Sequence, residues 1–145
     1  MAILLQGMGE FVTALKAAST AVDLATRAAT ATAAHLVEAQ IKTSLARATH
    51  PKGTPTPSQP GSPPALVSGR LRNSVRVDGP VKIAPGTWQA QIGPTAVYGR
   101  VQELGGGPVP LPSRPYAKPS LEQVQSSGQL GAVYRATWLN AIKGG

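Results

Sequence analysis

Residues 8–49 read MGEFVTALKAASTAVDLATRAATATAAHLVEAQIKTSLARAT, and this stretch decides the fold. Its apolar residues recur at spacings of three and four, which is the period of an α-helix with one apolar face. No proline or glycine interrupts the run from Glu10 to Thr49, and its many alanines favour helix. We predict a long N-terminal helix over 8–49. Its apolar face consists of Phe11, Leu15, Ala18, Val22, Ala25, Ala29, Ala33, Leu36, Val37, Ile41 and Leu45.

A helix of this length would measure about 60 Å, which exceeds the diameter of a compact domain of this size. It must therefore either kink or project from the domain. Threonines at positions 20, 26, 30 and 32 are the expected kink site, because β-branched side chains lose rotamer freedom in a helix. Two roles stay open for the apolar face: packing on the chain's own core, or burial between subunits.

The helical pattern ends in a proline-rich stretch. Six prolines and two glycines lie between Pro51 and Pro64, and they exclude regular structure there. We predict an irregular surface loop over 50–67. A loop of this length inside a small domain is usually functional or disordered.

The region 68–104 carries the strand signals. We predict a short helical turn at 68–73 that leads into a strand, followed by strands at 81–84 and 87–93 joined by the turn pair Pro85-Gly86. The alternation in TWQAQIG gives the last strand one buried and one wet face. Residues 96–105 fit either a further strand or a short helix. The expected sheet is small and mainly antiparallel, with three to four strands.

An extended arm over 105–117 and a C-terminal helix over 118–141 complete the chain. Pro110, Pro112 and Pro115 fix φ and disfavour helix in the residue before each of them, so they hold the arm extended. The order helix, loop, strands, arm and helix predicts an α+β fold. A length of 145 residues fits a single domain, 1–145.

Composition excludes several classes of function. The chain has no cysteine, so it has no disulfide, thiolate metal site or cysteine nucleophile. Only 4% of its residues are aromatic, which predicts a thin core that partners complete. No apolar run approaches the ~20 residues of a membrane span, and the start has no basic lead-in of a signal peptide. We expect a soluble protein made in the cytoplasm, with no membrane partner.

Catalytic residues are not evident. His35 lies in the alanine-rich helix and His50 at the edge of the loop, and neither belongs to a spaced ligand set. The glycines at 105–107 lack the Lys-Ser/Thr of a phosphate loop. We predict no enzyme, no metal and no cofactor. An unrecognised hydrolase that uses either histidine is the weakest alternative.

The net charge of +8 favours contact with polyanions. Arg70, Arg72 and Arg76 are the candidates for facing DNA. Because the chain lacks an aromatic-rich strand and a helix dense in lysine or arginine, we expect weak, sequence-independent phosphate contact at most. Solvated arginines and salt bridges between subunits are the other explanation.

Three short motifs occur in a distinctive order: SGRLRNSVRV (68–77), IGPTAVYGRVQELGG (92–106) and PSRPYAKPSLEQ (112–123). Together they resemble the head–tail joining family of long-tailed bacteriophages, which are the neck, tail-completion or minor tail proteins of HK-type siphophages. The resemblance covers 68–124, somewhat under half the chain. The matching positions are Gly69, Leu71, Arg72, Ser74, Ile92, Gly93, Tyr98, Glu103, Gly105, Pro112, Arg114, Pro115, Tyr116 and Pro119.

Three positions depart from the family pattern. Gly99 stands where alanine is usual, Leu104 where an aromatic residue is common, and Tyr116 where phenylalanine is usual. The proline-rich loop is also longer than the family leads us to expect.

The resemblance implies a structural protein of the virion, without catalysis. The chain would form a homo-oligomeric ring in the neck, six-fold or alternatively twelve-fold. That ring would join the head-side connector or stopper to the tail terminator or tail tube, around the channel through which DNA passes. The alternative function is a basic, non-sequence-specific DNA-binding protein associated with packaging.

The arm then has an expected role at the subunit interface, where its backbone would dock on a neighbour. The candidate interface residues are Glu103, Arg114, Pro115, Tyr116 and Pro119. In this hypothesis Arg114 pairs with the Glu103 carboxylate, within or across subunits, and Tyr116 fills an apolar pocket. Alternatively, Arg114 and Tyr116 lock the start of the last helix onto the chain's own sheet.

Overall fold

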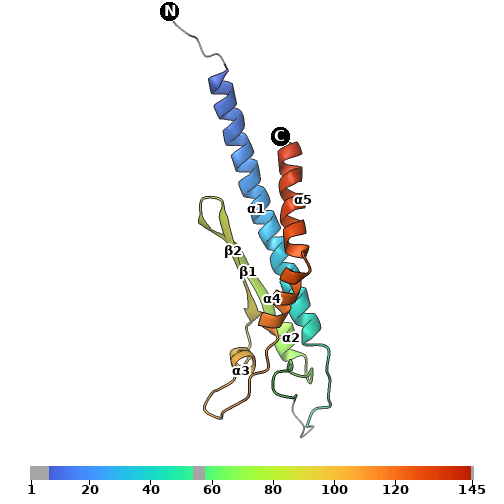
Figure 1. Cartoon of the computed structure of the whole chain (residues 1–145). Helices are drawn as coiled ribbons and strands as arrows, with labels where there is room; N and C mark the ends of the chain where they lie inside the picture. The colour runs from blue at the N-terminus through green and yellow to red at the C-terminus, as the bar shows by residue number, and fades with distance from the viewer. Residues whose placement is uncertain (1–6, 54–57, 145) are drawn as a thin grey trace, which may run out of the picture.

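A computed structural model describes residues 7–53 and 58–144. Its order of elements confirms the α+β fold (Figure 1). The elements are helix α1 (Met8–Ser44), helix α2 (Arg70–Ser74), strand β1 (Val75–Ala84), strand β2 (Thr87–Pro94), helix α3 (Gly99–Leu104), helix α4 (Ala117–Ser126) and helix α5 (Gln129–Lys143).

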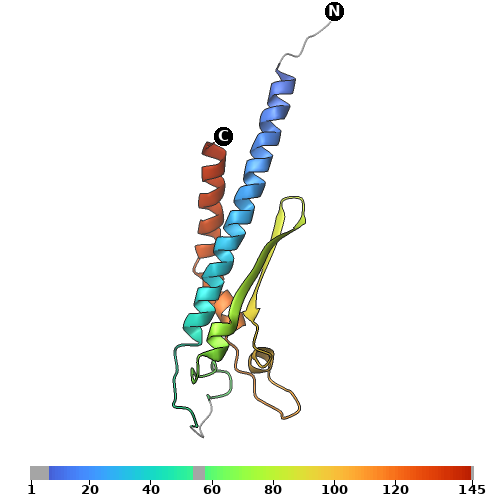
Figure 2. The ribbon, with the colours of Figure 1, turned by 180° about the vertical axis from the view of Figure 1, so that it is seen from behind.

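Helix α1 projects and does not kink. Its 37 residues, at about 1.5 Å each, make a rod of about 55 Å. The threonines are accommodated because their hydroxyls bond back to carbonyls four residues earlier, as Thr26 does to Val22 at 2.7 Å. The predicted end at Thr49 was wrong, since α1 ends at Ser44. Figures 1 and 2 show its first turns standing clear of every other element.

The sheet has two strands in the described part of the chain, not three to four. β1 and β2 form an antiparallel hairpin that runs from the pair Val75 and Pro94 to the pair Ala84 and Thr87. The prediction overcounted for two reasons. The strand after α2 and the strand at 81–84 are one strand, whose pairing shifts between Asp78 and Val81. Within residues 96–105, the chain forms helix α3 and not a further strand.

The hairpin lies against α1 and is tied to it at Asp23. Lys82 Nζ donates to Asp23 Oδ2 at 2.7 Å, and Trp88 Nε1 donates to Asp23 Oδ1 at 3.1 Å. The hydrogen bond from Lys82 is the main reason that the pKa of Asp23 lies below its usual range. Arg27, one turn further along α1, sits 5.7 Å from the centre of the Trp88 ring. These contacts fix the angle between hairpin and helix.

The predicted C-terminal helix is two helices. It breaks at Ser127–Gly128, where Gly128 takes a φ of 75° that residues other than glycine rarely adopt. α5 then runs back along α1 in the antiparallel direction. Tyr134 shares a 2.8 Å hydrogen bond with Thr30, and Trp138 Nε1 donates to Thr26 at 2.9 Å.

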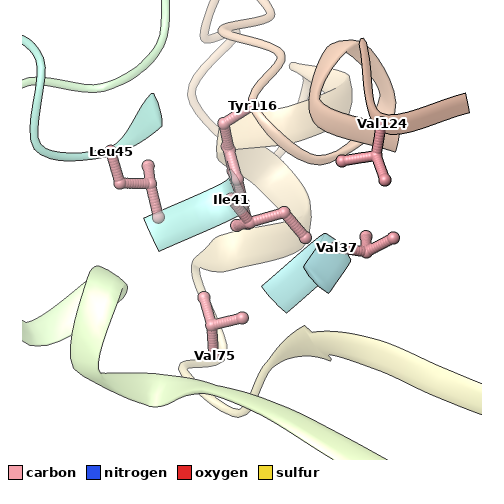
Figure 3. Close-up of a cluster of buried hydrophobic side chains, with 6 residues drawn as sticks. All are labelled: Val37, Ile41, Leu45, Val75, Tyr116 and Val124. Carbon is pink, nitrogen blue, oxygen red and sulfur yellow. The ribbon is translucent and has the colours of Figure 1, made fainter. Parts of the chain in front are cut away.

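The core sits where these elements meet, at the C-terminal half of α1. Figure 3 shows its buried cluster, to which α1 and the residue after it contribute three side chains. The cluster consists of Val37, Ile41, Leu45, Val75, Tyr116 and Val124. Half-buried Leu71, Ile92 and Leu130 pack around it. Among the described residues, the buried side of α1 runs from Ala25 to Ser44, which is the C-terminal half of the helix.

Gly99 lies in close contact with Pro94 and Tyr116. A Cβ at this position would overlap the Pro94 ring, coming within 2.9 Å of its Cβ, and would lie 3.1 Å from the Tyr116 hydroxyl. That hydroxyl donates to the Gly99 carbonyl at 3.0 Å. The extra oxygen of Tyr116, compared with phenylalanine, therefore occupies space that a side chain at position 99 would use.

We predict that Gly99→Ala lowers the free energy of unfolding by about 1–3 kcal/mol, because α3 must move away from Pro94 and Tyr116. Urea denaturation measures the loss. Gly93→Ala is the matched control, since a Cβ there meets nothing within 4 Å. Equal stabilities of the two variants would show that the space around Gly99 is not filled as described.

Candidate subunit interface and basic end

The first third of α1 carries an uncovered apolar stripe. Met8, Phe11, Val12 and Leu15 share one face of the helix, at spacings of three and four. Phe11 is 63% exposed and Leu15 58% exposed. The same face is buried further along the helix, beginning at Ala25. The stripe is thus a continuation of the core-facing side beyond the reach of the rest of the chain.

A cleft continues the stripe towards α5 and the hairpin tip. It encloses about 820 Å³ and has a largely apolar wall that includes Leu15, Val22, Trp138 and Ile142. Ile142 is 62% exposed. At the hairpin, Val81 and Ile83 are also exposed. Sequence patterning identified the faces of the helices, but it gave no way to tell which part of each face stays uncovered.

Glu103 does not pair with Arg114 within the chain, so the predicted intrachain clamp was wrong. Its Oε2 accepts the backbone N–H groups of Tyr116 at 2.7 Å and Ala117 at 2.9 Å, and its Oε1 accepts that of Lys118 at 2.9 Å. Glu103 therefore caps the N-terminus of α4, where free N–H groups and the helix dipole favour a carboxylate. The cap joins α3 to α4 across the arm.

Arg114 is buried and bonds to the proline-rich loop instead. Its Nε donates to the Ser58 carbonyl at 2.9 Å, and its backbone N–H donates to the Gln102 carbonyl at 2.7 Å. The neighbouring Ser113 carbonyl accepts the N–H of Gly61 at 2.9 Å. Arg114 thus fastens the loop and the arm to each other inside one chain.

Tyr116 lies in the chain's own core, where it is 1% exposed. Burial raises the pKa of its hydroxyl well above the usual range, and the nearby charge of Glu103 adds to the effect. The second predicted role, in which Arg114 and Tyr116 lock the start of the last helix onto the chain's own sheet, is matched in part. Tyr116 shares the buried cluster with Val75 of β1. Arg114 instead bonds to Ser58 and Gln102. Assignment of the set to a subunit interface stays a prediction.

The rest of the predicted extended arm is partly paired within the chain. Gly106 and Leu111 exchange two backbone hydrogen bonds, of 2.9 and 3.3 Å, which fold 106–111 into a closed loop. Val109 at its tip is exposed. Pro119 is exposed on α4 and Pro115 is half-buried. The exposed parts of the predicted interface set are therefore few.

The structure places the three candidate arginines around α2, at the end of the molecule opposite the projecting helix. Arg70 and Arg72 are exposed on α2, and Arg76 follows on β1. Arg76 bonds to the carbonyls of Asn73 at 2.6 Å and Val75 at 3.0 Å. Arg70 and Arg72 make no side-chain hydrogen bond or ion pair to any described residue.

Charge is unevenly distributed along the chain. Residues 39–77 hold six basic side chains and no acidic one, whereas the whole chain has a net charge of +8. Of the six, Lys42 pairs with Glu38 at 2.6 Å, and the others have no ion pair among the described residues. The described residues of this segment, 39–53 and 58–77, lie at the loop end of the molecule in Figure 1, which is called the basic end below. Its members are Lys42, Arg47, Lys52, Arg70, Arg72 and Arg76.

Across residues 7–53 and 58–144, no cluster of three or more histidines and carboxylates could hold a metal ion. In that same part of the chain, no helix combines the length and apolar character that crossing a membrane requires.

Comparison with known proteins found no matching family model, no matching curated protein and no matching solved structure.

We predict that Glu103→Gln destabilises the fold by about 1–2 kcal/mol, since an amide offers α4 a single oxygen and no charge. Chemical denaturation monitored by Trp fluorescence measures it. Glu122→Gln, on α4 itself, is the control. Glu122 is exposed, and its ion pair with Lys118 spans 4.0 Å at the surface, so removing the charge is expected to change the stability little. A loss as large in the control would refute the cap.

Proposed function

We propose that this chain is a structural ring subunit of a bacteriophage neck. In this role it joins the head-side connector or stopper to the tail terminator around the DNA channel. The ordered motifs of residues 68–124 support the proposal through their resemblance to the neck family. The observation that carries it furthest is the uncovered apolar stripe of α1, which suits a subunit whose burial is completed by neighbouring copies.

The geometry of the stripe fits repeated contact between copies. A ring needs two different surfaces on each subunit, one of which docks on the other in the next copy. Met8, Phe11 and Val12 are exposed on the projecting part of α1, whereas Leu15 also lines the largely apolar cleft beside Trp138 and Ile142. We expect the stripe of one copy to pack into this cleft or against the hairpin tip of the next. Closure at six copies follows the family expectation.

The stripe is testable in solution. We predict that the wild-type chain associates with rising concentration and that the double variant Phe11→Ser/Leu15→Ser stays monomeric, because each buried side chain supplies about 1.5–3 kcal/mol of contact energy. Sedimentation velocity measures the association. Leu24→Ser is the matched control, since Leu24 is equally exposed at 58%. Leu24 follows Leu15 by nine residues, so it lies on the opposite side of the helix.

Two results would count against the stripe as an interface. One is a wild-type chain that stays monomeric at every concentration that can be reached. The other is an equal loss of association in the Leu24→Ser control, which would point to general stickiness of the helix.

The second candidate function is a basic DNA-binding protein associated with packaging, and the basic end favours it. This function predicts binding to a DNA duplex that falls steeply as salt rises, because each phosphate contact releases counterions. Gel shifts at about 50 and about 200 mM salt measure it. Tight binding that survives the higher salt would favour this function over a channel that must release DNA.

A further inference from the structure

A small cavity lies within the basic end, between the segment 64–72 and helix α3. It encloses about 190 Å³. Leu45, Leu66 and Leu71 contribute apolar side chains to its lining, and Leu45 belongs to the buried core. Val67 also lines it and is 45% exposed. The cavity therefore offers room for one apolar side chain that enters from outside.

Besides Ser68, whose hydroxyl accepts the backbone N–H of Arg70 at 3.4 Å, four polar side chains line the same cavity, and all can donate hydrogen bonds. They are the guanidinium groups of Arg70 and Arg72, the hydroxyl of Tyr98 and the amide of Gln102. None of the four side chains has a hydrogen-bond partner among the described residues. Tyr98 and Gln102 can also accept hydrogen bonds, but the two guanidinium groups can only donate. Two unpartnered arginines beside apolar side chains favour a ligand that brings its own acceptors.

No carboxylate of residues 7–53 or 58–144 pairs with these donors. Residues 39–77 contain no acidic residue. Glu103 directly follows Gln102, but three backbone N–H groups of α4 already hold its two oxygens. Arg70 and Arg72 therefore have no carboxylate in contact with them in the described part of the chain.

We propose that this cavity binds an acidic peptide segment of a partner protein, with an apolar side chain of the segment inserted between its carboxylates. The apolar residue would enter against Val67 and Leu71. The flanking carboxylates would pair with Arg70 and Arg72, whose planar groups bind carboxylates in two-pronged fashion. The inference goes beyond the ring function and does not depend on it, because the cavity lies at the opposite end of the molecule from the α1 stripe.

The cavity fits a peptide better than it fits DNA. Nonspecific DNA contact needs exposed basic groups but no apolar pocket between them, because the phosphates are charged at every step. Here the two unpartnered arginines flank apolar side chains that phosphates would leave unused. Arg47 and Lys52, which are equally available to phosphates, are not part of the cavity lining.

The test measures binding of a fluorescently labelled peptide, Asp-Asp-Leu-Asp-Asp, to the full chain by anisotropy. We expect saturable binding that Arg70→Gln/Arg72→Gln weakens about tenfold or more, because two charge-assisted contacts are lost. Arg47→Gln/Lys52→Gln removes the same charge from the basic end outside the cavity. We expect this control to weaken binding less than about threefold, through long-range attraction alone.

Two further arms separate the apolar contact from charge. Replacing the leucine of the peptide by serine keeps its charge and is expected to weaken binding by about three- to tenfold. Val67→Glu places a carboxylate at the cavity and is expected to abolish binding. Thermal melting of each variant confirms that it is folded. Sedimentation velocity of the same proteins tests the ring proposal separately, because it measures self-association and not peptide binding.

Three outcomes would overturn the inference. The first is no saturable binding of the leucine peptide by the folded wild-type chain. The second is equal binding of the leucine and serine peptides. The third is equal weakening by the two double variants together with tight binding of a DNA duplex, which would make the basic end a general polyanion surface.

Discussion

Helix α1 has more apolar surface than the rest of the chain covers, and this mismatch shapes the whole molecule. A rod of about 55 Å needs partners along its length, and the hairpin, α4 and α5 pack against its C-terminal part. The buried cluster accordingly gathers around Val37, Ile41 and Leu45. Where the covering elements end, the same face of the helix continues as the exposed stripe.

The other end of the molecule depends on connections between loops. Glu103 caps α4, Arg114 fastens the proline-rich loop, and Tyr116 bonds to the Gly99 carbonyl inside the core. Each of these links joins segments that lie more than ten residues apart. They give shape to a region rich in proline and glycine, and they leave Arg70 and Arg72 exposed beside an apolar cavity. The two ends thus present different chemistry, one apolar and one basic.

Much of the fold could be predicted from local patterns. The spacing of apolar residues identified α1, and the pair Pro85-Gly86 identified the hairpin turn. The C-terminal break was harder, because Gly128 and Gly131 look alike in sequence. Only Gly128 adopts a positive φ, while Gly131 continues α5.

Local sequence patterns could not predict the contacts of the candidate residues. The side chain that caps α4 belongs to Glu103, which lies 13 residues before Tyr116, so no local capping pattern predicts it. Arg114 bonds to a backbone carbonyl of Ser58, which no side-chain pattern encodes. Charge complementarity suggested an ion pair between Glu103 and Arg114, but the Glu103 carboxylate instead accepts hydrogen bonds from the backbone N–H groups at the start of α4.

The central claim is that neighbouring copies complete the burial of α1. Under the proposed function, cryo-electron microscopy of the neck of the parent phage tests it most directly. The account predicts a closed ring between head and tail in which Phe11 and Leu15 are buried against the adjacent copy. Absence of the chain from the virion, or a ring that leaves this face of α1 in solvent, would contradict it.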